Sequence, residues 1–185
     1  MGVDWYSEEE KPLHEWSDVA VLLDTEDIAK TVKEAREYLR ERHGSRPFKI
    51  GLDIGSWSGY AGAIYNFEKA VGGPLIIPKN WKVWMREELP ALKYRLTRVI
   101  MYLEKEIKLI EAIRPMARAR LTVEKIGKFL QEYGLRGIIS EHKILEELED
   151  VPPIWSELVL RKVRSMRDFV DVILMETKGG IEVSW

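Results

Sequence analysis

Several residue types are missing or scarce in this chain, and each absence excludes a class of protein. The 185 residues include no cysteine, which excludes disulfide bridges, thiolate metal sites and a cysteine nucleophile. No apolar run approaches the roughly 20 residues that a membrane-spanning helix requires. The acidic start, residues 1–12, has no apolar segment like that of a signal peptide. These absences favour a soluble, cytoplasmic protein with a core large enough to fold without covalent staples.

Charge, by contrast, is abundant. Lys, Arg, Asp and Glu make up 32% of the residues, and the net charge is −2. Residues 1–43 and 137–157 are acidic, whereas residues 82–136 hold thirteen basic and seven acidic residues. A basic region can face phosphates, although a solvated face on long helices explains it equally well. Together with very few Asn and Gln, this composition resembles that of thermophilic proteins.

Hydrophobic periodicity predicts an α/β or α+β fold with a small central sheet and long amphipathic helices. The predicted helices are 25–44, 87–113, 122–134, 141–148 and 155–176. The predicted strands are 18–24, 49–54, 136–140 and an edge strand at 181–185. Residues 1–16 look irregular. We therefore expect an N-terminal extension, 1–47, and a main domain, 48–185, or one continuous domain.

Two segments fit more than one structure. Residues 60–71 fit a strand that turns at Gly72 into residues 74–78, but they also fit a helix that Gly72 ends. Residues 107–113 continue the apolar stripe of the long predicted helix, yet they also alternate as a strand would.

The most informative stretch is 48–71, FKIGLDIGSWSGYAGAIYNFEKAV. An apolar run ends in Asp53, and a glycine-rich turn follows. This stretch resembles the opening hairpin of RuvC-type Holliday-junction resolvases, which are RNase H-like nucleases. Leu109-Ile110-Glu111 is similar to the apolar-apolar-Glu at the end of that family's next strand. Asp168 and Asp171 look like the paired aspartates of its last helix.

The resemblance implies an RNase H-like core and a Mg²⁺-dependent endonuclease that cleaves branched DNA. Two-metal phosphodiester hydrolysis needs three or four carboxylates within about 4 Å of a metal pair, and Mg²⁺ prefers oxygen ligands. The implied ligands and catalytic residues are Asp53, Glu111, Asp168 and Asp171. Lys143 and Lys162 are candidates for the family's charge-stabilising lysine. A two-fold symmetric junction would suit a homodimer. The residues expected to bind DNA phosphates are Arg95, Arg98, Arg118 and Arg120.

Each acid also has a purely structural explanation. Asp53 can initiate a turn at the end of a strand. Glu111 becomes a surface residue if the long helix continues through it. Asp168 and Asp171 can be ordinary surface charge on a helix.

Two other functions also fit the sequence. LDIGSWSGYAGAI is similar to the first motif of S-adenosylmethionine-dependent methyltransferases, with Asp53, Gly55 and Gly59 at the cofactor. The third possibility is a non-enzymatic helical protein that binds nucleic acid or serves in an assembly. Its seven tryptophans are scattered along the sequence, and we expect most of them to anchor the core or an interface rather than to stack on bases.

Overall fold

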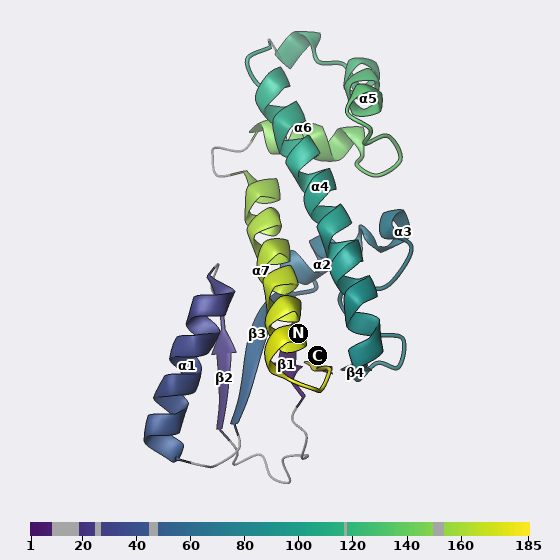
Figure 1. Ribbon diagram of the computed structural model, residues 1–185. Coiled ribbons are helices and arrows are strands. Elements are labelled where there is room, and N and C mark those ends of the chain that lie inside the picture. Colours follow the sequence, from purple (N-terminus) through teal and green to yellow (C-terminus); the bar gives the residue numbers. More distant parts are fainter. Residues whose placement is uncertain (9–18, 25–26, 45–47, 117, 150–153) are drawn as a thin grey trace.

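The computed structural model describes residues 1–8, 19–24, 27–44, 48–116, 118–149 and 154–185. The fold is α/β, with a mixed five-stranded open sheet and mainly helical structure elsewhere (Figure 1). The strands are β1 (Gly2–Ser7), β2 (Val19–Leu23), β3 (Phe48–Ser56), β4 (Val83–Trp84) and β5 (Ile181–Ser184). The helices are α1 (Ile28–His43), α2 (Tyr60–Tyr65), α3 (Glu68–Val71), α4 (Leu89–Ile113), α5 (Val123–Glu132), α6 (Glu141–Glu149) and α7 (Trp155–Glu176), with 3-10 turns at Arg86–Glu88 and Arg118–Arg120.

The strand order in the sheet is β2-β3-β1-β5-β4. β2 runs parallel to β3 and α1 connects the two, whereas β1 is antiparallel to both β3 and β5. Strands from the predicted N-terminal extension therefore lie on both sides of β3. The expectation that residues 1–16 are irregular is wrong for residues 2–7, which form the central strand. The expected edge strand at 181–185 is interior, because β4 pairs with β5 on its outer side.

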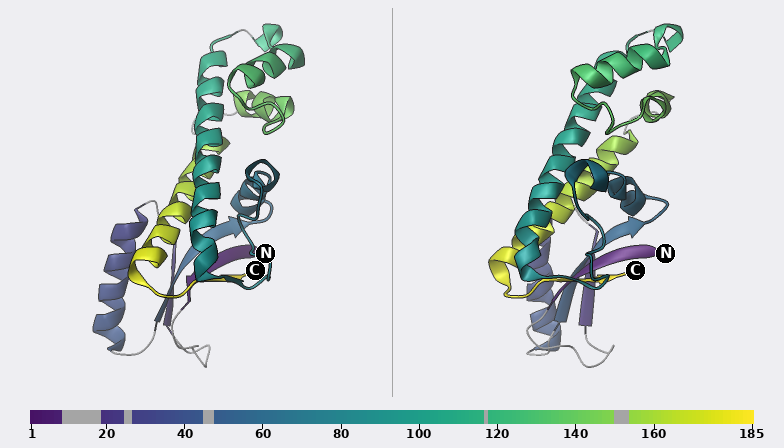
Figure 2. Two further views of the ribbon diagram at one scale, coloured as in Figure 1. Left: turned by 45° about the vertical axis from the view of Figure 1, so that its right-hand side comes forward. Right: turned by 90° about the vertical axis from the view of Figure 1, so that its right-hand side faces the viewer.

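Alternation along the strands separates two faces of the sheet. Val3 and Trp5 of β1 are fully buried, and Ile50, Leu52 and Ile54 of β3 are at most 3% exposed. Figure 2 shows α1, α7 and α4 together on one side of the sheet. The sequence positions between the buried ones, including Asp4 and Asp53, belong to the opposite face.

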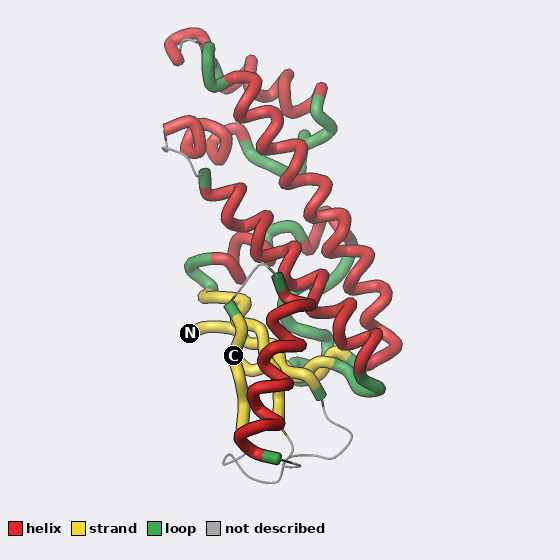
Figure 3. The backbone as a smooth tube through the Cα atoms, turned by 60° about the vertical axis from the view of Figure 1, so that its left-hand side comes forward, coloured by secondary structure: helices red, strands yellow, loops and turns green. Residues whose placement is uncertain are grey.

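The helical layer extends far beyond the sheet (Figure 3). α4 packs along α7 and then continues past it to carry α5 and α6. We call this region, residues 104–149, the distal arm. Within the described residues, no helix is both long and apolar enough to cross a membrane.

The structure resolves the two ambiguous segments as helical. Residues 60–71 form α2 and α3, and α4 runs unbroken through residues 107–113 because its buried stripe continues to Ile113. The strand expected at 136–140 is wrong. Gly137 has a φ of 78° there, and the amides of Ile138 and Ile139 both donate to the carbonyl of Leu135 in a tight turn.

Candidate functional site: a cleft between α2 and α6

The structure does not bring the four carboxylates of the nuclease hypothesis together. Asp53 lies on the sheet face opposite the buried residues of β3, whereas Asp171 lies on α7 and pairs with Lys93 of α4 at 2.5 Å. Glu111 is exposed near the end of α4. The helix rises about 27 Å between Lys93 and Glu111, so Glu111 is remote from the α7 aspartates.

A pair of magnesium ions therefore does not fit these four residues. Among the described residues, no group of three or more His, Asp or Glu side chains could hold a metal ion. The oxygen ligands of a two-metal site must lie within a few ångströms of one another, and here the sheet and the length of α4 separate them.

The three aspartates have local partners instead. Asp53 Oδ1 accepts a hydrogen bond from the Gly55 amide at 2.7 Å, which matches the turn-forming explanation. Across the strands Asp53 faces Asp4, whose pKa is raised by burial and then by the Asp53 charge. Burial raises the pKa of Asp168, and nearby Arg167 partly offsets this by lowering it.

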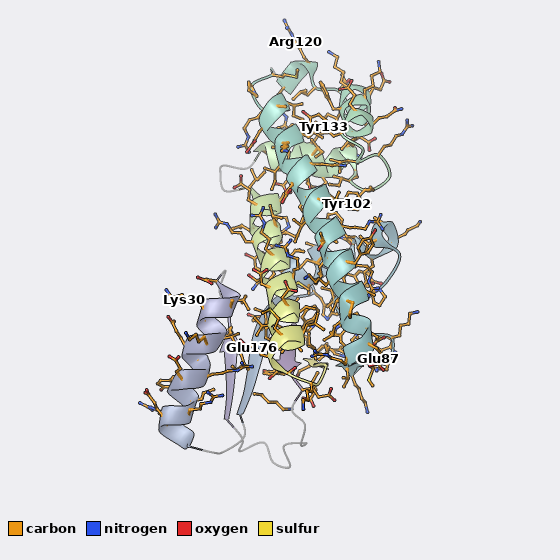
Figure 4. The ribbon with its side chains drawn as sticks, viewed as in Figure 1. Lys30, Glu87, Tyr102, Arg120, Tyr133 and Glu176 are labelled. Atoms are coloured by element: carbon orange, nitrogen blue, oxygen red, sulfur yellow. The ribbon has the colours of Figure 1, made fainter. Side chains whose placement is uncertain are left out.

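The arginines expected to bind DNA have varied roles. Arg95 donates from Nε to the Pro74 carbonyl at 2.9 Å, and Arg98 donates from Nη2 to the Tyr102 hydroxyl at 2.8 Å. Both side chains are half-buried against the segment around α3. Arg118 forms an ion pair with Glu149, and Arg120 is exposed at the far end of the distal arm (Figure 4).

A cavity with both polar and apolar walls lies between α2 and α6. A cavity of about 560 Å³ opens there, within the 300–1,000 Å³ typical of small-molecule sites. Its walls come from α2, from the turn before α6, from α6 and from the first residue of α7. The lining residues are Ala63, Asn66, Phe67, Ile138, Ile139, Ser140, Lys143, Glu146, Glu147 and Trp155.

A second cavity of about 470 Å³ shares Ala63, Asn66 and Trp155 with the first. It is lined on its other side by the turn at residues 57–59 and by α2. The glycine-rich stretch that stands out in the sequence thus reaches a cavity, although it does so through residues 57–67 rather than through Asp53. We refer to the two joined cavities as the cleft.

Two buried carboxyl groups lie beside the cleft. Glu106 of α4 is fully buried and Glu147 of α6 is 3% exposed. The Ser156 hydroxyl oxygen lies 2.9 Å from Glu106 Oε1 and 2.7 Å from Glu147 Oε1. Lys143 Nζ donates to Glu106 Oε2 at 3.2 Å. These residues form a chain that leads from the interior of the distal arm to the cleft wall.

Glu147 also caps the start of α7. The helix has no side-chain cap from its own N-cap residue, Ile154, and Glu147 Oε1 accepts the Ser156 amide at 3.1 Å in its place. A carboxylate is stabilised at the positive end of a helix dipole. The other oxygen, Glu147 Oε2, is buried and has no hydrogen-bond partner among the described residues.

The geometry around Ser156 limits how the two carboxyl groups can be hydrogen-bonded. A serine hydroxyl carries one hydrogen, so it can donate to only one of two ionised carboxylates at full strength. A proton on Glu106 resolves this, because Glu106 can then donate to Ser156 while Ser156 donates to Glu147. Burial raises the pKa of Glu106, whereas Lys143 and Ser156 lower it in part and Glu147 raises it.

Sequence reasoning missed Glu106, Glu147 and Ser156, although the first two carry a signal. Glu106 falls on the buried stripe of α4 between Leu103 and Ile110, and Glu147 follows Ile144 on the inner side of α6. An acid at a core position of an amphipathic helix is unusual and needs a partner. Comparison of the chain with protein-family models, with curated proteins and with solved structures finds no match.

Proposed function

We propose that the protein binds a small organic molecule in the cleft between α2 and α6. The observation that carries this proposal is the state of Glu147, a buried carboxylate that lines the cavity with one oxygen unpaired among the described residues. An unsatisfied buried polar atom costs about 1–3 kcal/mol, and more if charged. A ligand that donates a hydrogen bond to Oε2 would recover that free energy.

The cleft also has the groups that general acid–base chemistry requires. A pair of carboxyl groups whose environments favour different protonation states can act as an acid and a base. Here Glu147 adjoins the cavity, and Glu106 lies behind it with Ser156 between them. With a proton on Glu106, the hydrogen-bonded chain could pass a proton through Ser156 to Glu147, and Glu147 could then give it to a ligand, which leaves Glu106 as the carboxylate.

Ligand screening tests this function directly. Saturation-transfer NMR with a library of neutral, cationic and anionic aromatic fragments should identify binders that share the cleft. Ala63 lines both cavities, so Ala63→Leu should fill the cleft and abolish binding. The matched control is Ala112→Leu on the exposed face of α4, which should leave binding unchanged. A library with no binder, or binding that survives Ala63→Leu, would contradict the proposal.

Cleavage of branched DNA by an RNase H-like homodimer remains a prediction, and its supporting observation is the sequence resemblance around Asp53. The test is Mg²⁺-dependent nicking of a four-way junction. Under that hypothesis Asp53→Asn abolishes nicking, whereas Asp4→Asn, a change on the same sheet face, preserves it. Nicking by both variants would exclude Asp53 as a metal ligand.

A further inference from the structure

We propose that the ligand of the cleft is an organic cation, a protonated amine, amidine or guanidine, whose N–H groups donate to Glu147 Oε2. This inference rests on the proposed binding function and adds the chemical class of the ligand. It follows from the charges of the lining residues, from the hydrogen bonds that Glu147 makes, and from the aromatic side chains that line the cavity.

The charges around the cavity favour a cation. α6 contributes Lys143, Glu146 and Glu147 to the lining, and α4 contributes Glu106 behind them. The other lining residues, from α2, from residues 138–140 and from Trp155, carry no formal charge. The Lys143 ammonium donates to Glu106 Oε2 at 3.2 Å rather than to Glu147. Within the described part of the chain, Glu147 therefore has no salt-bridge partner of its own.

The hydrogen bonds of the Glu147 carboxylate indicate that the ligand supplies a hydrogen-bond donor. Its Oε1 accepts from the amide and the hydroxyl of Ser156, while Arg114 approaches only its backbone carbonyl, at 3.4 Å. Glu147 Oε2 is therefore left to accept a hydrogen bond from a ligand in the cavity. Charge-assisted N–H···O⁻ bonds are about twice as strong as neutral ones, so a cationic nitrogen satisfies this oxygen better than a hydroxyl does. Among the residues that the structure describes, a metal ion would lack the further ligands that it needs.

The walls are suited to an aromatic or aliphatic cation. Phe67 and Trp155 line the cavity, and Trp155 is braced by stacking on Tyr60 with ring centroids 5.0 Å apart. The Lys143 ammonium lies 5.5 Å from the centre of the Phe67 ring, within the range of a cation–π interaction. The protein's own ammonium thus shows that this wall accommodates positive charge.

The experiment compares three ligands of one shape and different charge on the unaltered protein. Isothermal titration calorimetry with benzamidine, benzyl alcohol and benzoate should show benzamidine binding about tenfold or more tightly than benzyl alcohol, with benzoate weakest. The indole N–H resonance of Trp155, assigned with Trp155→Phe, should shift on addition of benzamidine. Equal affinity for the three ligands would overturn the inference while leaving the binding function intact. No binding by these ligands or by any library fragment would overturn both.

Two variants sharpen the result. Glu147→Gln should lower benzamidine affinity to that of benzyl alcohol. The matched control is Glu132→Gln, at an exposed residue of α5 outside the lining, which should change the affinity by less than about twofold because exposed charges are screened. Unchanged benzamidine affinity in folded Glu147→Gln would overturn the inference. Because Glu147 also caps α7, its variant must first be shown by circular dichroism to be folded. If it is not, the three-ligand comparison on the unaltered protein decides the question.

Discussion

The guanidinium of Arg86 donates from Nη1 to the backbone carbonyl of Ile173 at 2.8 Å. It also reaches the carbonyls of Thr177 at 2.8 Å and Leu174 at 2.6 Å. These carbonyls lie at the end of α7, where a helix has no internal partners for its last turn. One arginine therefore fastens the C-terminus of α7 to the segment that begins α4, and its positive charge lies at the negative end of the helix dipole.

Arg86→Ala should lower the free energy of unfolding by about 2–4 kcal/mol, because several carbonyls lose a charged donor. Arg86→Lys should lose part of that amount, since an ammonium cannot reproduce the planar fork. Urea denaturation measures both. Arg120→Ala, at the exposed end of the distal arm, is the control and should change stability by less than about 0.5 kcal/mol. Equal losses in Arg86→Ala and Arg120→Ala would refute this role.

Gly62 and Gly127 are both helical glycines, yet alanine should have opposite effects at the two sites. A Cβ at Gly62 would lie 2.0 Å from the Trp57 carbonyl oxygen, so Gly62→Ala should displace the turn beside the cleft and cost about 1–3 kcal/mol. A Cβ at Gly127 would meet only the end of the Glu141 side chain, at 3.3 Å. Gly127→Ala should gain about 0.5–1 kcal/mol from helix propensity. Thermal denaturation distinguishes the two, and a stabilising Gly62→Ala would contradict the packing described.

The Glu106 carboxyl should make the protein less stable as the pH rises, and substitution of Glu106 by glutamine should remove this dependence. Because its pKa is raised in the folded protein, folding is favoured most below the ordinary pKa of about 4.3. That contribution is lost as the pH rises through the folded-state pKa. Glu106→Gln resembles the protonated acid and does not titrate, so its stability relative to the unaltered protein should increase from pH 4 to pH 8. Denaturation curves at several pH values measure this. If the stability of Glu106→Gln relative to the unaltered protein falls as the pH rises, the pKa of Glu106 is not raised in the folded protein.

Asp53 and Asp4 face each other across β3 and β1, so neutralising either should stabilise the sheet. Asn at position 53 keeps the oxygen that accepts the Gly55 amide and removes the repulsion. Asp53→Asn should therefore be as stable as the unaltered protein or gain up to about 1 kcal/mol at pH 7. The gain should shrink as the pH falls, because protonation of Asp4, whose pKa is raised, removes the repulsion. Asp4→Asn should behave alike, and a loss of stability in both variants would show that the two charges do not oppose each other.

Local sequence patterns predicted most of the helices. The periodicity of residues 155–176 gives α7 with the bounds expected, and Thr122 caps α5 by accepting the Lys125 amide at 3.2 Å. These features depend on interactions within a few residues. The first two residues of the predicted helix 25–44 lie outside the described residues.

The pairing of distant segments could not be inferred in the same way. Residues 2–7 do alternate, with Val3 and Trp5 inward, but the acidic residues that follow obscured the pattern. Trp81 and Trp185, far apart in sequence, lie 5.7 Å apart by ring centroids with both side chains at least half exposed. Separation along the sequence therefore did not reveal this contact, because contact across the sheet edge is set by strand order.

By itself the sequence limited the fold class to α/β or α+β, and it determined the long helices and the exclusion of thiol chemistry, because composition and periodicity act locally. Only the tertiary structure decided where charged groups meet. It separates Glu111 from the aspartates of α7 by about 27 Å along α4, and it places Glu106, Glu147 and Ser156 within hydrogen-bond distance. The physical reason is that burying a carboxylate costs free energy unless hydrogen-bond partners offset it. Those partners come from other helices, and tertiary packing rather than spacing along the chain brings them into contact.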